Sequence, residues 1–429
     1  MTTGTTTDRA GAGRSEFLEA VRTAGAALRE LFEPTPLQRN AFLSARYGAE
    51  IWLKREDLSP VRSYKLRGAF TAVRNALAAR PDQRHFVCAS AGNHAQGMAF
   101  ACAHFGAEGL VFMPVTTPQQ KIDKTAQFGG AQVEIRLGGD YFDDTLRAAK
   151  AHAEATGALF MPPYDDADVI LGQATCAVEI LEQLPAGCLP DVVVLPVGGG
   201  GLASGVIPVL EAAAPGIDVF FAEPQGAASL QAGLKAGHPV TLPVVDSFVD
   251  GAAVARIGDL NFAELGRFAP EQVLSAPEGR ICTTILEMLN IEGMVLEPAG
   301  ALSIDVLRDV PDIAGKTVVA VVSGGNFDFE RLPEVKERAL RWEGRKKFYI
   351  LRLPQRPGAL REFLEMLGPG DDIARFEYLK KNARNFGSVL IGIESVAAGN
   401  FESLEARMSA SGLAYQDITE DAIIMNLII

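Results

Sequence analysis

The sequence predicts an α/β protein with parallel sheets over its first 330 residues and a separate α+β domain after them. Short apolar segments alternate with helix-length segments, which is the pattern of right-handed βαβ units. The expected strands are apolar throughout, as is typical where helices cover both faces of a parallel sheet. From residue 347 onward the order becomes strand, helix, strand, strand, helix, strand, which is the ferredoxin-like arrangement.

The chain begins with a segment for which we predict no regular structure. Residues 1–14 are rich in Thr and Gly and contain no apolar core segment, so we expect a disordered tail and no signal peptide. A helix is expected at 15–32, where apolar side chains recur at helical spacing and Ser15 is a suitable N-cap. Pro34 and Pro36 would end this helix.

Alternating strands and helices fill the next part of the chain. We expect a domain at 15–330 with a smaller subdomain at about 58–165. After a strand at 51–57 and a helix at 68–79, the expected pairs of strand and following helix are 85–89 with 97–104, 110–114 with 118–128, and 132–137 with 141–156. Further strands are expected at 191–197, 218–223 and 317–322.

The last part of the chain has a different composition. Residues 331–346 are dense in charge, and we predict a linker helix there. A small domain is expected at 347–429. Its expected strands are 348–353, 373–379, 388–394 and 414–418, and its expected helices are 358–367 and 401–411.

Charge and cysteine content exclude several classes of protein. The 429 residues carry a net charge of -13, which disfavours binding to nucleic acid or to an anionic membrane. The five cysteines form no CxxC pair and the five histidines are scattered, so we expect reduced thiols in the cytoplasm and no zinc site. The uncharged segment 192–210 contains four consecutive glycines and two prolines, which predict a strand, a turn and a helix instead of a membrane span.

Lys65 lies in the segment SYKLRGA (63–69), between the expected strand at 51–57 and the expected helix at 68–79. A lysine held in a pocket loses its charge more readily than one in solvent and becomes a nucleophile toward carbonyl groups. For any single lysine, a surface charge is the alternative. The motifs that follow make Lys65 a candidate catalytic residue.

Four consecutive glycines follow the expected strand at 191–197 and precede a helical segment. Their backbone N–H groups can approach a phosphate, whose charge the helix N-terminus favours. No Lys-Ser or Lys-Thr pair follows, which excludes a Walker loop, and the spacing differs from a GxGxxG fingerprint. A flexible turn is the alternative; we expect the phosphate of a small cofactor.

Two other strand ends carry polar residues. The segment SAGNHAQG (90–97) can bind a carboxylate through exposed N–H groups, and Asn93 can donate from its side chain; a helix cap with a core histidine is the alternative. Ser323, in the segment VSGGN (322–326), follows the expected strand at 317–322, and a capping serine in a turn is the alternative. Because ligand sites of parallel sheets lie at the carboxyl ends of strands, we expect these groups to face one crevice.

A reactive lysine, a phosphate-binding turn and a hydroxyl at a strand end suggest pyridoxal 5′-phosphate. The segments SYKLRGA, SAGNHAQG, PVGGGGLASG and VSGGN resemble those of the fold-type II pyridoxal-phosphate enzymes. The chain is similar to the biosynthetic threonine dehydratases (threonine ammonia-lyases) over nearly all of its length after the tail. This resemblance implies two parallel-sheet subdomains and a C-terminal ACT-like regulatory domain.

The resemblance also implies roles for individual residues. Lys65 would hold the cofactor as a Schiff base and then remove the Cα proton, Asn93 would bind the ring hydroxyl, and Ser323 would meet the ring nitrogen. The cofactor phosphate would bind to Gly198, Gly199, Gly200, Gly201 and Leu202. The substrate carboxylate would bind to the loop formed by Ser90, Ala91, Gly92, Asn93 and His94.

The implied reaction is deamination of L-threonine to 2-oxobutanoate and ammonia, the first step of isoleucine biosynthesis. Ser323 cannot keep the ring nitrogen protonated as an aspartate would, which favours prompt loss of the β-hydroxyl. Ala91 stands where racemases of this fold carry a serine, which disfavours racemisation. Glu223 is present where relatives can bind a cation, but Ser229 replaces the expected aspartate, so we expect no divalent metal.

The segments PQRPGAL (354–360) and DDIARFEYLKK (371–381) resemble the ACT-like regulatory domain of these dehydratases, whose implied effector is isoleucine. Packing between subunits is the alternative role. The resemblance implies a homodimer or homotetramer. Two other functions stay open: a serine-preferring dehydratase, and a non-catalytic amino-acid sensor on the same scaffold.

Overall fold

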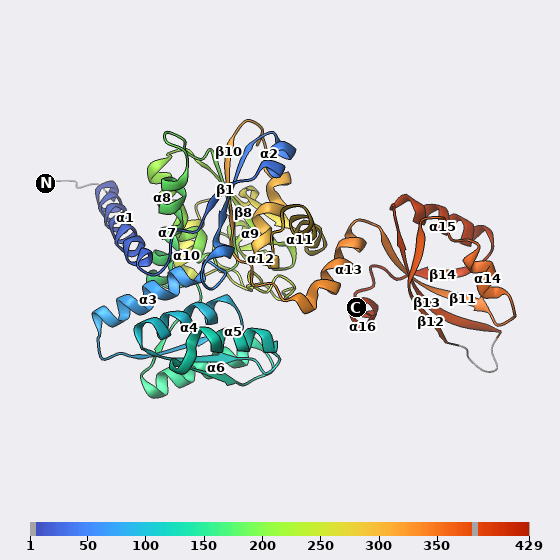
Figure 1. Cartoon of the computed structure of the whole chain (residues 1–429), viewed down its shortest axis with the longest axis horizontal. Coiled ribbons are helices and arrows are strands. Elements are labelled where there is room, and N and C mark those ends of the chain that lie inside the picture. The colour runs from blue at the N-terminus through green and yellow to red at the C-terminus, as the bar shows by residue number, and fades with distance from the viewer. Residues whose placement is uncertain (1–5, 380–384, 429) are drawn as a thin grey trace. The chain divides into compact units, whose positions relative to one another are not determined.

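The computed structural model describes residues 6–379 and 385–428, which belong to two compact units (Figure 1). The first unit contains the chain up to 278 together with 288–328, and the second contains 279–287 and the chain from 329 onward. In the part of the chain that the structure describes, no helix is both long and apolar enough to cross a membrane.

A six-stranded sheet forms the centre of the first unit, with the strand order β1-β2-β10-β7-β8-β9. Strand β1 is antiparallel to β2, and all other neighbours are parallel. The strands are β1 Leu37–Arg39, β2 Glu50–Arg55, β7 Val192–Pro196, β8 Asp218–Pro224, β9 Val273–Ala276 and β10 Thr317–Val322. The apolar strands predicted in this part of the chain are confirmed; β1 and β9, the two short edge strands, were not predicted.

A second, smaller sheet contains four parallel strands in the order β5-β4-β3-β6. Its strands are β3 His85–Ala89, β4 Glu108–Met113, β5 Val133–Leu137 and β6 Leu159–Phe160, and the helices around it in Figure 1 are α4 Asn93–Phe105, α5 Gln119–Gly129 and α6 Phe142–Thr156. The three predicted strand–helix pairs are confirmed. Helix α4 begins at Asn93 and not at residue 97, which places Asn93 and His94 in its first turn.

The other α-helices described before residue 329 are α1 Thr6–Arg29, α2 Ala41–Tyr47, α3 Lys65–Ala79, α7 Ala167–Gln183, α8 Gly201–Ala213, α9 Ser229–Ala236, α10 Asp259–Leu265, α11 Glu278–Glu292 and α12 Pro298–Asp305. Helix α1 starts before Ser15, where we had expected the tail at 1–14 to end. Residues 6–14 contain no proline, so the helix can extend through them in spite of Gly11 and Gly13. Residues 1–5 lie outside the described part of the chain.

The main hydrophobic core lies between the large sheet and helices α7 and α8. Val193, Leu195 and Phe221 of the sheet pack in one buried cluster with Val206 and Leu210 of α8. The core strands are apolar on both faces, as predicted, because helices lie on each side of a parallel sheet.

The second unit contains a four-stranded antiparallel sheet in the order β12-β13-β11-β14. Its elements follow α13 Leu332–Trp342 in the order β11 Lys346–Pro354, α14 Ala359–Leu364, β12 Asp371–Leu379, β13 Phe386–Ser395, α15 Gly399–Ala410 and β14 Ala414–Asp417. This order confirms the ferredoxin-like prediction. A last helix, α16 Ala422–Ile428, was not predicted. The final two residues of the segment 371–381 lie outside the described residues, and the expected domain boundaries stay predictions.

Helices α3 and α7 approach each other closely through glycine. A Cβ added to Gly172 of α7 would lie 2.3 Å from the carbonyl oxygen of Arg67 and 2.7 Å from the Cα of Gly68. In addition, Oε1 of Gln173 accepts a hydrogen bond from the N–H of Gly68 at 3.2 Å. The first turn of α3, which begins at Lys65, is therefore held against α7.

Gly172→Ala should destabilise the protein, because backbone atoms of α3 would have to move away from α7. Overpacking of this kind costs about 1–3 kcal/mol, and the urea midpoint should fall with little change in the m-value. Gly25→Ala is a matched control on α1, since its Cβ would be 3.9 Å from the nearest atom, on Thr175 of α7. Equal midpoints for the two variants would contradict the close contact described above.

Candidate active site

The predicted site residues lie at the carboxyl ends of strands from both sheets. The tetraglycine turn (Gly198–Leu202) follows β7, Ser323 follows β10, and the loop at 90–94 follows β3. Lys65 is the first residue of α3. The N–H of Tyr64 donates to the carbonyl of Ser323 at 3.1 Å, so the start of α3 is joined to the end of β10.

The amine of Lys65 is held inside the protein. Its Nζ donates to the carbonyl of Pro163 at 2.7 Å and lies 5.2 Å from the ring centre of Tyr64. Burial lowers the pKa of Lys65 to about 8, although the carboxyl group of Glu297 acts in the opposite direction. About half of the amines are therefore neutral at pH 8, against less than about one per cent for an ordinary lysine.

The tetraglycine turn presents backbone N–H groups without acceptors. From Gly198 to Leu202, none of these groups donates a hydrogen bond to any residue that the structure describes, and all of the turn except Gly198 is buried. Gly200 has a φ of 93°, a left-handed conformation that a side chain would strain. Buried N–H groups are costly without a partner, so this turn, at the N-terminus of α8, fits an anion such as phosphate.

Neighbouring groups hold the turn in place and connect it with Lys65. Nδ2 of Asn261 donates to the carbonyl of Gly199 at 2.7 Å. A Cβ on Gly199 would lie 2.2 Å from the ring of Tyr164, which only a glycine allows. Because Tyr164 directly follows Pro163, the segment that accepts a hydrogen bond from Lys65 also packs against the turn.

Asn93 is oriented by two side chains from the other end of the chain. Its Nδ2 donates to Oε1 of Glu297 at 2.7 Å, and its Oδ1 accepts from Nδ2 of Asn326 at 2.7 Å. These bonds fix the orientation of the Asn93 amide, and the second N–H of its Nδ2 remains for a ligand. Glu297 is buried, and burial raises its pKa to about 7.

Ser323 is buried at the end of β10. Its Oγ donates to the carbonyl of Ala299 at 3.1 Å. The hydroxyl proton can turn from this carbonyl toward a ligand without movement of the oxygen, because a serine hydroxyl is both donor and acceptor. Ser323 therefore offers a neutral polar contact and no charge.

The loop at 90–94 offers main-chain donors, whereas the imidazole of His94 belongs to the core. Among the described residues, no group accepts the N–H of Ala91 or of Asn93. The ring Nε2 of His94 lies 3.0 Å from the carbonyl of Met161, and burial lowers the pKa of His94 to about 3. A carboxylate at this loop would thus meet backbone N–H groups, with no imidazolium beside them.

Sequence reasoning missed three residues of this site: Glu297, Asn326 and Tyr164. Glu297 stands before Pro298 at the start of α12, where an acidic residue is ordinary because it favours the helix dipole. Asn326 lies in the VSGGN segment, so its position was a usable signal. For Tyr164 the sequence carried no signal that we can identify.

Comparison with known proteins identifies the family. Residues 28–324 match the family described as "Pyridoxal-phosphate dependent enzyme". The chain belongs to the pyridoxal-phosphate dependent enzymes. Residues 337–428 match a second family, described as "C-terminal regulatory domain of Threonine dehydratase".

Three similar proteins carry related names. The enzyme is 48% identical over 397 residues to the biosynthetic L-threonine dehydratase IlvA of Bacillus subtilis, covering 92% of this chain and 93% of the relative. Among solved structures, the processed threonine deaminase isoform 2 of Solanum lycopersicum superposes with a TM-score of 0.69 at 35% identity, covering 76% of this chain and 94% of the other. Maize serine racemase superposes with a TM-score of 0.68 at 26% identity, covering 76% of this chain and 98% of the other.

These findings confirm the resemblance, the fold-type II class and pyridoxal phosphate as the cofactor of this enzyme. The residues present fit that group, because the tetraglycine turn has buried N–H groups for a phosphate and Lys65 supplies an amine with a lowered pKa. The contacts of single residues with the cofactor and the substrate stay predictions.

Glu223, the residue considered for a cation site, has a different use in this pyridoxal-phosphate dependent enzyme. Its carboxyl oxygens accept the backbone N–H groups of Leu230 at 2.7 Å and Gln231 at 3.0 Å, at the start of α9. Within the described ranges, no three acidic, histidine or cysteine side chains are placed to hold a metal ion. The expectation of no metal stays a prediction.

Uptake of pyridoxal phosphate by cofactor-free protein should depend on the neutral amine of Lys65. The uptake rate, followed by visible absorbance, should rise with pH, with its midpoint near pH 8, and level off above about pH 9. Glu297→Gln keeps an acceptor for Asn93 but removes a negative charge that stabilises the ammonium form, so the midpoint should move to lower pH. Glu264→Gln, a change at the surface, should leave the pH midpoint of uptake unchanged. A midpoint that moves upward in Glu297→Gln would contradict this electrostatic coupling.

Proposed function

We propose that this chain deaminates L-threonine to 2-oxobutanoate and ammonia, the first step of isoleucine biosynthesis. The observation that carries the proposal is the placement of Lys65 and the tetraglycine turn against the same two residues, Pro163 and Tyr164. Relatives named L-threonine dehydratase, which match more than nine-tenths of this chain, support the choice of substrate.

Lys65 supplies the base of the proposed reaction. When bound, pyridoxal phosphate supplies a conjugated ring that withdraws electrons from Cα of the amino acid. The neutral amine of Lys65 accepts the Cα proton, since burial lowers its pKa to about 8. The backbone N–H groups of the loop at 90–94 hold the substrate carboxylate, and the free N–H of Asn93 holds the ring hydroxyl.

Ser323 and Ala91 favour elimination over other outcomes. Ser323 offers a neutral hydroxyl and no carboxylate, so a positive charge on the ring nitrogen gains no ionic partner there. With a weaker electron sink, expulsion of the β-hydroxyl is favoured over slow reprotonation of Cα. Ala91 has no proton to donate to the opposite face, which argues against the racemisation named for the maize relative.

The alternatives are a serine-preferring dehydratase and a non-catalytic amino-acid sensor. The regulatory-domain match at 337–428 favours a biosynthetic threonine enzyme, because a purely catabolic one needs no end-product control. Lys65, Asn93 and Ser323 all retain side chains suited to catalysis, which argues against the sensor. Steady-state keto-acid production from threonine and from serine separates the three.

Lys65→Ala should abolish the visible absorbance of the bound cofactor and lower the turnover of L-threonine by about 10²–10⁴-fold or more. The control is Lys316→Ala, which removes a surface lysine paired with Asp218 and should keep both signals. Keto-acid formation and absorbance are measured on the same samples. Full activity with unchanged absorbance in Lys65→Ala would show that another group performs this chemistry.

We further propose isoleucine as the effector, a homodimer or homotetramer as the assembly, and the cytoplasm as the location. The match of residues 337–428 to a threonine dehydratase regulatory domain supports an end-product effector. None of the five cysteines, all of which lie in the described part of the chain, forms a disulfide, and four of them are buried, which supports a reducing compartment.

A chain truncated after Arg345 retains α13 and lacks the strands and helices from β11 onward. This chain should turn over threonine but lose inhibition by isoleucine, measured as initial rates with and without the effector. Circular dichroism checks that the truncated chain is folded. Unchanged inhibition in a folded truncated chain would place the effector site before Lys346.

A further inference from the structure

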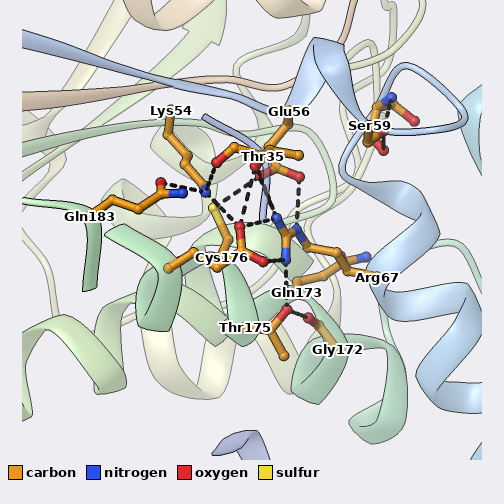
Figure 2. A network of polar contacts seen from close by, with 12 residues as sticks. Thr35, Lys54, Glu56, Ser59, Arg67, Gly172, Gln173, Thr175, Cys176 and Gln183 are labelled. Atoms are coloured by element: carbon orange, nitrogen blue, oxygen red, sulfur yellow. Dashed lines mark hydrogen bonds and ion pairs between the residues drawn. The ribbon is translucent and has the colours of Figure 1, made fainter. Parts of the chain in front are cut away.

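A cluster of four buried charged side chains lies beneath the start of α3 (Figure 2). Its members are Lys54, Glu56, Arg67 and Glu179, whose side chains are at most 5% exposed. Nζ of Lys54 donates to Oε2 of Glu179 at 2.6 Å and to the carbonyl of Thr35 at 2.6 Å. The two cations and two carboxylates have no net charge.

Arg67 is the centre of this charge cluster. Its Nε and Nη2 each donate to Glu56 at 2.8 Å, and its Nη1 and Nη2 each donate to Glu179 at 2.7 Å. Two threonine hydroxyls also accept from Arg67, Oγ1 of Thr175 at 3.1 Å from Nη1 and Oγ1 of Thr35 at 3.1 Å from Nη2. One guanidinium thus binds two carboxylates through paired hydrogen bonds, a geometry that a lysine cannot reproduce.

The stability of the fold alone does not account for such a cluster. Moving four charges out of water carries a large desolvation cost, and apolar side chains of similar size often replace a buried ion pair without loss of stability. What charges of this kind provide is a defined geometry, because each hydrogen bond fixes a direction as well as a distance.

The two carboxylates come from elements that lie next to two other parts of the candidate site. Glu56 follows Arg55, which is paired with Val322 in the parallel register of β2 and β10, so Glu56 lies beside the strand end that carries Ser323. Glu179 belongs to α7. Helix α7 packs tightly on α8, since a Cβ on Gly205 of α8 would lie 2.5 Å from a carbonyl of α7, and α8 begins at the tetraglycine turn.

Arg67 itself lies in the first turn of α3, two residues after Lys65. The backbone of Lys65 has little freedom, because a Cβ on Gly97 of α4 would lie 3.1 Å from its carbonyl carbon and oxygen. A positive side chain is unfavourable at a helix N-terminus. The two carboxylates compensate for it here, so the charge cluster determines where this turn of α3 can lie.

We propose that Arg67, together with Glu56 and Glu179, is a positioning group for Lys65. The charge cluster ties the start of α3 to the Ser323 strand end through Glu56 and to the helix of the tetraglycine turn through Glu179. The backbone of Lys65 is therefore held in position relative to Ser323 and to the tetraglycine turn. This inference rests on the proposed role of Lys65 and adds the group that fixes its position.

The test compares Arg67→Lys with Arg267→Lys in the full-length holoenzyme. Arg67→Lys keeps the charge and loses the paired hydrogen bonds. Arg267 also lies between two carboxylates, Glu211 and Glu264, but at the half-exposed surface. We expect Arg67→Lys to release the cofactor at least tenfold faster on dilution, followed by absorbance, and to lower kcat at least tenfold at unchanged KM. Arg267→Lys should change neither.

A purely structural role predicts a different result. Arg67→Lys would then unfold at lower urea concentration, yet each folded molecule would release cofactor and turn over substrate at the wild-type rate; that result would overturn the proposal. If Arg67→Lys does not fold, Thr175→Val decides, because it removes one acceptor of Arg67 and keeps all four charges. We expect a two- to fivefold faster release, and a wild-type rate would again overturn the proposal.

Cofactor release is measured without substrate, so failure of threonine as the substrate leaves this test intact. A wild-type protein that binds no cofactor would overturn both the proposed function and this inference. A wild-type protein that binds the cofactor, beside a folded Arg67→Lys variant that releases it at the same rate, would overturn the inference alone.

Discussion

Arg67 forms paired hydrogen bonds with two buried carboxylates, and the arrangement of the candidate site depends on this interaction. The bonds connect α3 with Glu56, the residue that follows β2, and with α7 at one point in the interior. Lys65 stands at the start of α3, and Ser323 and the tetraglycine turn stand at the ends of β10 and β7. These three groups therefore share one frame, built on the larger sheet. Asn93 belongs to α4 beside the smaller sheet, and its hydrogen bonds with Glu297 and Asn326 join it to this frame.

The tetraglycine turn shows how this frame prepares a place for an anion. Its N–H groups face no acceptor among the described residues, and they are buried at the start of a helix, where partial positive charge accumulates. Such groups have no acceptor within the described protein, so they favour a bound anion. The ring of Tyr164 and the amide of Asn261 keep the turn in one conformation. These two contacts thus fix the geometry of the turn that would receive an anion.

The sequence predicted the strands and the motifs of the site because these signals are local. Apolar runs next to glycines identify buried strand ends, and Lys65 and Gly198–Leu202 lie within such signals. Glu297 and Glu179 could not be predicted, since an isolated acidic residue in a sequence is indistinguishable from a surface charge. The role of each depends on a hydrogen-bond partner more than a hundred residues away in the sequence. Helix α1 extends past the predicted start because composition alone does not specify where a helix begins.

Burial shifts the pKa values of Lys65 and Glu297 in opposite directions. It lowers the pKa of Lys65 to about 8 and raises that of Glu297 to about 7, so each group is driven toward its neutral form. A fully ionised Glu297 would favour the ammonium form of Lys65 and reduce the amine available as a base. A neutral Glu297 would relieve that effect, while one of its oxygens could still accept the hydrogen bond from Asn93. The carboxyl group that orients Asn93 therefore also holds the pKa of Lys65 above the value that burial alone would give.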